Sequence, residues 1–230
     1  MQFEDLNWMD VERYLETDDR IILVTGATEQ HAYLSLMTDI LIPSKIAEAV
    51  AEREKVLVAP PFAFGYSREF SYYPGTISIT RQTFDLVVTE MVESLLHQGF
   101  RRFFMLNGHG GNHLPARLHD FLSEDEVQVI WHDWRLGKAL RDFERKHGLA
   151  FAHANWGENF DFTRVSDVPD MEKPTIALPD EFEDPQAARE TLGDGSFGGI
   201  YKVDEVLMQE LFAAVVDEAA AVVRGMAIKG

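Results

Sequence analysis

Three side chains near the start of the chain carry donor atoms that divalent metal ions prefer, namely Glu29, His31 and Asp39. They follow residues 21–24, a short β-branched apolar run that predicts a buried strand. Residues two apart point to one side while the backbone stays extended. Glu29 and His31 can therefore reach one point, and Asp39 can return to it from just before the next helix. A capping loop with solvated charges is the alternative for this stretch alone.

A second stretch of the same kind favours the metal site. Residues 101–106 predict another buried strand, and it leads directly into residues 107–112, where three glycines surround His109. Glycine allows the backbone and the imidazole to approach a ligand closely. In open α/β sheets, ligands bind beyond the carboxyl ends of the strands, and both loops lie at such ends. Together, the two loops predict one metal site at this edge of the sheet.

The motifs in these loops resemble those of the creatininase family, which includes creatinine amidohydrolase and formamide-cleaving and peptide-cleaving relatives. The resemblance spans about residues 5 to 165, and the two main motifs are specific only in combination. It implies an α/β fold, with residues 1–230 as a single three-layer domain around a mostly parallel sheet. The matching segments are Glu-Gln-His at 29–31 with a downstream Thr-Asp, Tyr-Pro-Gly-Thr-Ile-Ser at 73–78, Asn-Gly-His-Gly-Gly-Asn at 107–112, and His-Ala at 153–154.

The resemblance also implies two metal ions that share one carboxylate and hold a bridging hydroxide, the nucleophile for a carbonyl carbon. The matching ligands are Glu29, His31, His109 and Asp39, with Asp39 as the bridging carboxylate. We expect one or two divalent ions, with Zn²⁺ favoured and Mn²⁺ or Fe²⁺ as the other candidates.

The fifth ligand and a catalytic histidine are expected within residues 153–159. His153 matches the catalytic histidine of the family and would donate a proton to the departing nitrogen. The alternative for His153 is a core histidine beside Phe151. The register of the His-Ala pair puts Trp156 where relatives have their first glutamate. We therefore expect Glu158, the only carboxylate of this stretch, as the fifth ligand and as a catalytic group.

Three departures from the family pattern concern the substrate. The loop between Glu29 and Asp39 is one residue shorter than usual and lacks a second histidine. Phe70 follows Glu69 where relatives have a histidine. Gly111 stands two residues after the second-motif histidine, where true creatininases carry a glutamate. Because of Gly111, creatinine is not the expected substrate. The two ligand motifs at the strand ends predict metal-dependent hydrolysis of a non-peptide C–N bond, of the cyclic amide or formamide type, in a small molecule.

Two other function classes compete with this interpretation. A non-catalytic metal-binding scaffold, or an oligomeric binding protein on the same fold, would tolerate the same departures. Metal analysis separates these readings poorly because both bind metal, whereas substrate turnover separates them well. A nucleotide-binding α/β domain is disfavoured, since no glycine fingerprint opens a helix after the first predicted strand.

The composition limits the partners and the compartment. A formal net charge of −18 over 230 residues argues against nucleic acid and anionic membranes as partners. The absence of cysteine excludes disulfides and thiolate ligands and fits the cytoplasm. We expect no signal peptide from residues 1–5, and no apolar run reaches the roughly 20 residues that a membrane-spanning helix needs.

Hydrophobic periodicity predicts the elements that position these residues. Strands are predicted at 21–24, 55–59, 76–79, 101–106 and 127–131, and helices at 5–15 with Asn7 or Asp5 as its cap, 43–54, 83–98, from about 113, 136–147 and 204–223. Aromatic residues 70, 72 and 73 are candidates for the wall of a substrate pocket, with plain packing as the alternative.

Residues 151–200 contain several prolines and acidic clusters and are predicted to be irregular, as a lid or an oligomer contact. A monomer would have to cover or expose the aromatic side chains of this segment. The segment therefore predicts a homo-oligomer, with a hexamer built from dimers or trimers as one form of it. These aromatic residues are Trp156, Phe160, Phe162 and Phe197.

Overall fold

Strand β1 (Arg20–Thr25) lies inside a parallel sheet of order β2-β1-β3-β4. It pairs with β2 (Leu57–Val58) on one side and with β3 (Arg102–Asn107) on the other, and β3 pairs with β4 (Gln128–Asp133). The chain is seen in a computed structural model that describes residues 1–121, 126–177, 182 and 184–226. The expected α/β architecture with a mostly parallel sheet is confirmed.

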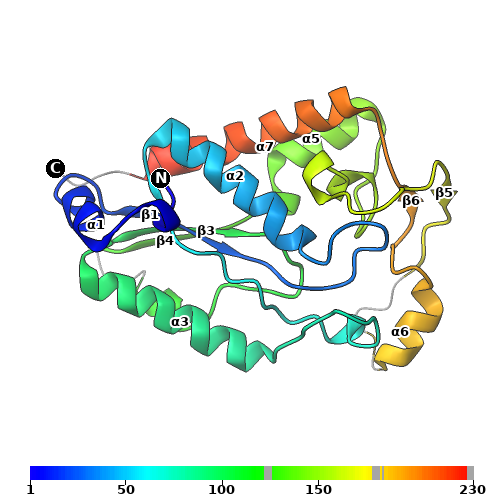
Figure 1. Cartoon of the computed structure of the whole chain (residues 1–230), viewed down its shortest axis with the longest axis horizontal. Helices are drawn as coiled ribbons and strands as arrows, with labels where there is room; N and C mark the ends of the chain where they lie inside the picture. Colours follow the sequence, from blue (N-terminus) through cyan, green and yellow to red (C-terminus); the bar gives the residue numbers. More distant parts are fainter. Residues whose placement is uncertain (122–125, 178–181, 183, 227–230) are drawn as a thin grey trace.

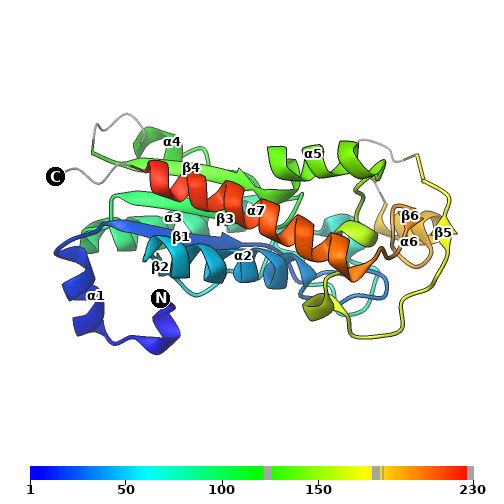
Figure 2. The same ribbon diagram turned by 90° about the horizontal axis from the view of Figure 1, so that it is seen from above.

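Helices cover both faces of the sheet, with α2, α5 and α7 on one face and α3 on the other (Figures 1 and 2). Within the described residues, no helix is long and apolar enough to cross a membrane. The α-helices are α1 (Trp8–Leu15), α2 (Thr38–Glu54), α3 (Arg81–Gln98), α4 (Leu118–Phe121), α5 (Lys138–His147), α6 (Pro185–Leu192) and α7 (Glu205–Gly225). A two-stranded antiparallel sheet, β5 (Glu172–Lys173) with β6 (Gly199–Ile200), lies near α6.

The alternation of side chains along β1 explains why its central residues 21–24 are all apolar. Ile22 and Val24 pack against α2 and α7, whereas Ile21 and Leu23 pack against α3. All six residues of β1 are buried. A parallel strand that is covered on both faces shows this continuous apolar run instead of an alternating pattern.

Two predicted helix starts are wrong. Helix α2 begins at Thr38 instead of residue 43, so Asp39 lies in its first turn and Pro43 lies inside the helix. Proline is a common signal for a helix start, which is why the prediction placed the start there. Helix α3 begins at Arg81 instead of residue 83, and Thr80 caps it, because the Thr80 hydroxyl accepts a hydrogen bond from the backbone N–H of Thr83.

Three other predictions need correction. The helix expected from residue 113 begins only at Leu118, because Pro115 disfavours helical backbone at the residue before it. In place of the strand predicted at 76–79, only Ile77 and Ser78 form isolated bridges. The segment 151–200 contains α6, whose start is marked by Asp184 accepting from the backbone N–H of Gln186. One predicted cap is confirmed: Asn7, not Asp5, caps α1, since the Asn7 side chain accepts a hydrogen bond from the backbone N–H of Met9.

The order of connections puts a topological switch point between β1 and β3. Helix α2 connects β1 to β2 on one face, and α3 connects β2 to β3 on the other (Figure 1). The strand order therefore reverses between β1 and β3, and open α/β sheets bind ligands beyond the carboxyl ends of the strands at such a point. The Glu29/His31 loop follows β1 and the His109 loop follows β3, so both begin at this switch point.

Candidate metal centre

The structure brings all six predicted site residues together beyond the carboxyl ends of β1 and β3. Two come from the loop after β1, one from the first turn of α2, one from the loop after β3, and two from the segment after α5. Their side chains are 0 to 4% exposed, except for one histidine at 11%. In chain order they are Glu29, His31, Asp39, His109, His153 and Glu158.

Asp39 lies at the middle of the cluster and directs its two oxygens to different partners. Oδ1 lies 3.0 Å from Nε2 of His31, and the same nitrogen lies 3.8 Å from Oε2 of Glu158. Oδ2 lies 2.9 Å from Nδ1 of His109, which lies 3.3 Å from Oε1 of Glu29. Two groups of three donors therefore share the Asp39 carboxylate, one on each oxygen.

The donor set fits divalent metal ions. In each group the ligand atoms lie within 4.8 Å of one another, and ligands at 2.0–2.2 Å from one tetrahedral ion lie roughly 3.4 Å apart. Imidazole nitrogens and carboxylate oxygens are common ligands of zinc and similar ions. Oε2 of Glu29 is buried and has no hydrogen-bond partner among the described residues. A buried carboxylate oxygen without a partner is costly, and a cation would satisfy it.

Backbone carbonyls orient His31 and His109, the two histidines that face Asp39. Nδ1 of His31 lies 3.1 Å from the carbonyl oxygen of Glu29, and Nε2 of His109 lies 2.8 Å from the carbonyl oxygen of Tyr66. An N–H donated to each carbonyl leaves the other ring nitrogen facing Asp39. Outer hydrogen bonds of this kind fix the ring orientation of metal-binding histidines and set which nitrogen can bind the ion.

Burial and neighbouring charges shift the pKa values of the cluster residues. Burial opposes a charged His31, but Asp39, with Glu158 and Glu29, raises the pKa of His31 to about 10. Burial likewise opposes charge on His109, and Glu29 and Asp39 hold its pKa well above the usual value. Burial raises the pKa of Glu158 to about 7, and burial together with His31 lowers that of His153. A divalent ion would compete with a proton for each of these histidines, because imidazole binds a metal in its neutral form.

Two glycines allow Asp39 to reach this position. A Cβ atom on Gly26 or on Gly108 would lie 2.2 Å from the backbone carbonyl oxygen of Asp39. The ends of β1 and β3 therefore both press against the first turn of α2. This close approach carries the Asp39 side chain between the two loops.

Replacing Gly108 by alanine is expected to destabilise the fold and weaken metal binding together. The new methyl group meets backbone and the ring of Pro43, neither of which can rotate away, and overpacking of this kind costs about 1–3 kcal/mol. Urea unfolding and zinc titration measure the two effects. Gly225→Ala is the matched control, since its Cβ meets no described atom within 4 Å. Equal stability and affinity in both variants would show that the close approach does not position Asp39.

Polar residues at the strand ends, which the sequence did not single out as part of the site, support the His109 loop. Asn107, the last residue of β3, donates to the carbonyl oxygen of His109 at 2.6 Å and to Oδ2 of Asp133 at 2.9 Å. Asp133 ends β4 and pairs with Arg135 at 2.6 Å. The signal was a polar residue at the end of each strand, but only the register of the sheet shows that Asn107 and Asp133 are neighbours.

The aromatic candidates for a pocket wall differ in their surroundings. Phe70 and Tyr73 are buried in a small core cluster, whereas Tyr72 is 50% exposed. The Phe70 ring stacks on the His153 ring at 4.7 Å between centroids. In the segment predicted to contact other subunits, the chain itself buries Trp156 and Phe160. These two aromatics therefore give no support to the predicted homo-oligomer, which stays a prediction.

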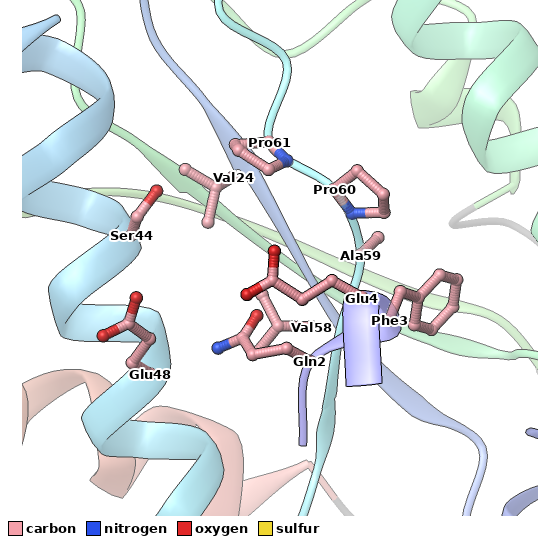
Figure 3. Close-up of a pocket in the computed structure, with 10 residues that line it drawn as sticks. All are labelled: Gln2, Phe3, Glu4, Val24, Ser44, Glu48, Val58, Ala59, Pro60 and Pro61. Atoms are coloured by element: carbon pink, nitrogen blue, oxygen red, sulfur yellow. The ribbon is translucent and has the colours of Figure 1, made fainter. Parts of the chain in front are cut away.

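A separate cavity of about 330 Å³ lies between α2 and the N-terminal residues (Figure 3). The polar side chains around it include Gln2, Glu4 and Glu48, and Pro60 and Pro61 lie across from α2. None of its lining residues belongs to the six-residue cluster. This cavity is therefore distinct from the candidate metal centre.

The sequence resembles several known hydrolases. It is 30% identical over 115 residues to creatinine amidohydrolase of Pseudomonas putida, covering 47% of this chain and 44% of that protein. It is 36% identical over 99 residues to mycofactocin precursor peptide peptidase of Mycolicibacterium smegmatis, 40% of each chain. It is 28% identical over 143 residues to 3-dehydro-scyllo-inosose hydrolase of Thermotoga maritima, 61% of this chain and 46% of that protein. The matched segments thus span less than half of each relative.

Solved structures share the fold over nearly the whole chain. A creatininase crystal structure matches with a TM-score of 0.80 at 23% identity, covering 96% of this chain and 95% of that one. A mutant creatininase described as the Zn-Zn type matches with a TM-score of 0.79 at 22% identity, covering 97% of this chain and 96% of that one. The family model named Creatininase, described as creatinine amidohydrolase, matches residues 4–223. Because this match covers most of its length, the chain belongs to the creatininase family.

Proposed function

We propose that the chain is a metal-dependent hydrolase of a non-peptide C–N bond, of the cyclic amide or formamide type, in a small molecule. The observation that carries the proposal is the buried Asp39 carboxylate, which directs one oxygen to His31 and Glu158 and the other to His109 and Glu29. This arrangement supports two divalent ions that share Asp39, with Zn²⁺ as the first candidate and Mn²⁺ or Fe²⁺ as the others.

Ions bound in the two groups would act as Lewis acids and lower the pKa of a bound water. The protein residues supply the rest of the reaction. Hydrolysis forms a bond from the water oxygen to the carbonyl carbon, breaks the C–N bond and puts a proton on the nitrogen. We assign His153 to the side of the departing nitrogen, because its Nδ1 lies 3.8 Å from Oε1 of Glu29 and its side chain is the most exposed of the six. Glu158 serves as the fifth ligand and as a proton-handling carboxyl group in this proposal.

Removal of metal by a chelator is expected to abolish turnover, and Zn²⁺ or Mn²⁺ is expected to restore it. The reason is that the five proposed ligand side chains are buried and converge on one place, where bound metal would supply the activated water. The measurement is the rate of hydrolysis before chelation, after it and after metal is returned. Full activity in the chelated protein would contradict the proposal.

The substrate panel includes a cyclic amide, a formamide and a short peptide, because relatives with peptidase and other hydrolase names match this chain. Turnover of the first or second class, without the third, is the expected result. Metal binding without turnover of any class would favour the non-catalytic scaffold. Preference for the peptide would instead overturn the proposed bond class.

The remaining parts of the proposal concern the chain as a whole. Residues 1–230 act as one domain, and the family match to residues 4–223 supports this. A cytoplasmic location and assembly into a homo-oligomer, such as a hexamer, stay predictions from the sequence.

A further inference from the structure

We infer that Gln30, which Gly195 holds in place, keeps the proton of His153 on Nδ1, so that His153 faces the centre as a neutral hydrogen-bond donor and not as a metal ligand. This inference rests on the proposed function, because it assigns the role of one residue in that site. Gln30 and Gly195 would then be positioning residues. They act through His153, and neither belongs to the ligand groups.

Two hydrogen bonds, one at each end of the amide group, fix the orientation of the Gln30 side chain. Its Oε1 accepts a hydrogen bond from the backbone N–H of Ala32 at 3.1 Å, and its Nε2 donates to the carbonyl oxygen of Gly195 at 3.0 Å. A flipped amide would place its oxygen against the Gly195 carbonyl and its NH₂ group against the Ala32 N–H. Both contacts would be repulsive, so Nε2 must face Gly195.

The same Nε2 atom of Gln30 then determines which ring nitrogen of His153 carries the proton. It lies 2.8 Å from Nε2 of His153 and has a second N–H to donate. An amide nitrogen is only a donor, so His153 must offer a lone pair on Nε2. The backbone carbonyl of Gln30 lies 3.1 Å from the same imidazole nitrogen. A proton directed at that carbonyl would bring two N–H groups against each other. The imidazole proton is therefore on Nδ1, 3.8 Å from Oε1 of Glu29.

Gly195 is needed for this arrangement because a side chain there would occupy the place of the amide. A Cβ atom on Gly195 would lie 1.8 Å from Oε1 of Gln30, and its φ is +98°. The loop around Gly195 also contacts His153 directly. The backbone N–H of Phe197 donates to the carbonyl oxygen of His153 at 3.1 Å, and the two rings lie 4.9 Å apart. The glycine-rich segment 193–199 thus positions the histidine and its partner together.

The chemical consequence is a change in how His153 acts. A neutral Nδ1–H can donate a hydrogen bond to the substrate oxygen or nitrogen on which charge develops, and losing one such donor typically costs about 10²–10³ in kcat. It cannot bind the ion through Nδ1, so the third possible group, Glu29 with His31 and His153, is not a metal site. The nitrogen then takes its proton from the attacking water.

The test reads the tautomer of His153 by ¹H–¹⁵N correlation of its imidazole in zinc-loaded protein labelled at histidine. His153→Gln identifies the signal. We expect a protonated Nδ1 and an unprotonated Nε2. Gln30→Glu replaces the donor by an acceptor of the same shape and is expected to move the proton to Nε2. Gly195→Ala is expected to disturb the tautomer, whereas Gly193→Ala keeps the cost of a positive φ without the clash, since no described atom lies within 4 Å of its Cβ.

Two further readouts separate positioning from folding. We expect Gln30→Glu to lower kcat about 10²-fold with unchanged zinc content and little change in KM. A wild-type spectrum with Nε2 protonated, or with Nδ1 shifted by bound zinc, would overturn the inference. An unchanged tautomer in Gln30→Glu would also overturn it. If no amide is hydrolysed while Nδ1 carries the proton, the proposed function fails and the positioning of His153 stands.

Discussion

Asp39→Asn is expected to remove most of the metal from the protein and to lower turnover more than about a hundredfold. Loss of an outer hydrogen-bond partner alone costs about 10–100-fold in metal affinity, and Asp39 is the only residue common to the two ligand groups that contain Glu158 and His109. The change from carboxylate to amide alters one atom and removes one charge. Elemental analysis of dialysed protein and the hydrolysis rate measure the two effects.

The exposed carboxylate Asp217 provides the control for this variant. Its side chain is 71% exposed and pairs with Arg53 on the surface, so Asp217→Asn is expected to retain metal and activity. Zinc should also stabilise the wild type and the control, by about 2.7 kcal/mol at a hundred times the dissociation constant, but not Asp39→Asn. Equal zinc content in the two variants would contradict the shared role of Asp39.

His109→Ala against His113→Ala is the second comparison with a large expected difference. The two histidines lie four residues apart in one loop, but His109 is buried against Asp39, whereas His113 is 44% exposed and lies 3.1 Å from Asp85. We expect His109→Ala to lose turnover by more than about a hundredfold, because it removes a ligand. His113→Ala should change stability by at most about 1 kcal/mol, as for other surface ion pairs.

The rates of both variants, with their thermal unfolding temperatures, decide this comparison. A folded His109→Ala protein with the wild-type rate would exclude His109 from the reaction. If His113→Ala also loses turnover, the loss in His109→Ala would come from a disturbed loop after β3 and not from the removal of a metal ligand.

The strands of the parallel sheet, and the residues that converge as candidate metal ligands, could be predicted because each carries a local signal. The buried runs of β1 and β3 are continuous and apolar, and the polar motifs follow them directly. Even Glu158, which departs from the family register, lies 3.8 Å from Nε2 of His31 as a ligand of the cluster would. These features depend on residues that are close in sequence.

What could not be predicted depends on contacts between distant segments. The role of Gly108 follows from its approach to the Asp39 carbonyl, 69 positions away, and no local pattern records that approach. The same holds for Gly195, which reaches Gln30 from the other end of the chain. The early start of α2 was missed because a proline inside a helix has the same local appearance as a proline at its start.

The anomalous difference map of a crystal grown with Zn²⁺ and measured at the zinc absorption edge tests the metal centre most directly. We expect two peaks, both next to the Asp39 carboxylate, one beside His31 and Glu158 and the other beside Glu29 and His109. His153 should lie outside the coordination distance of both. A map with no peak at Asp39, or with a single peak held by Glu29, His31 and His153, would contradict this expectation.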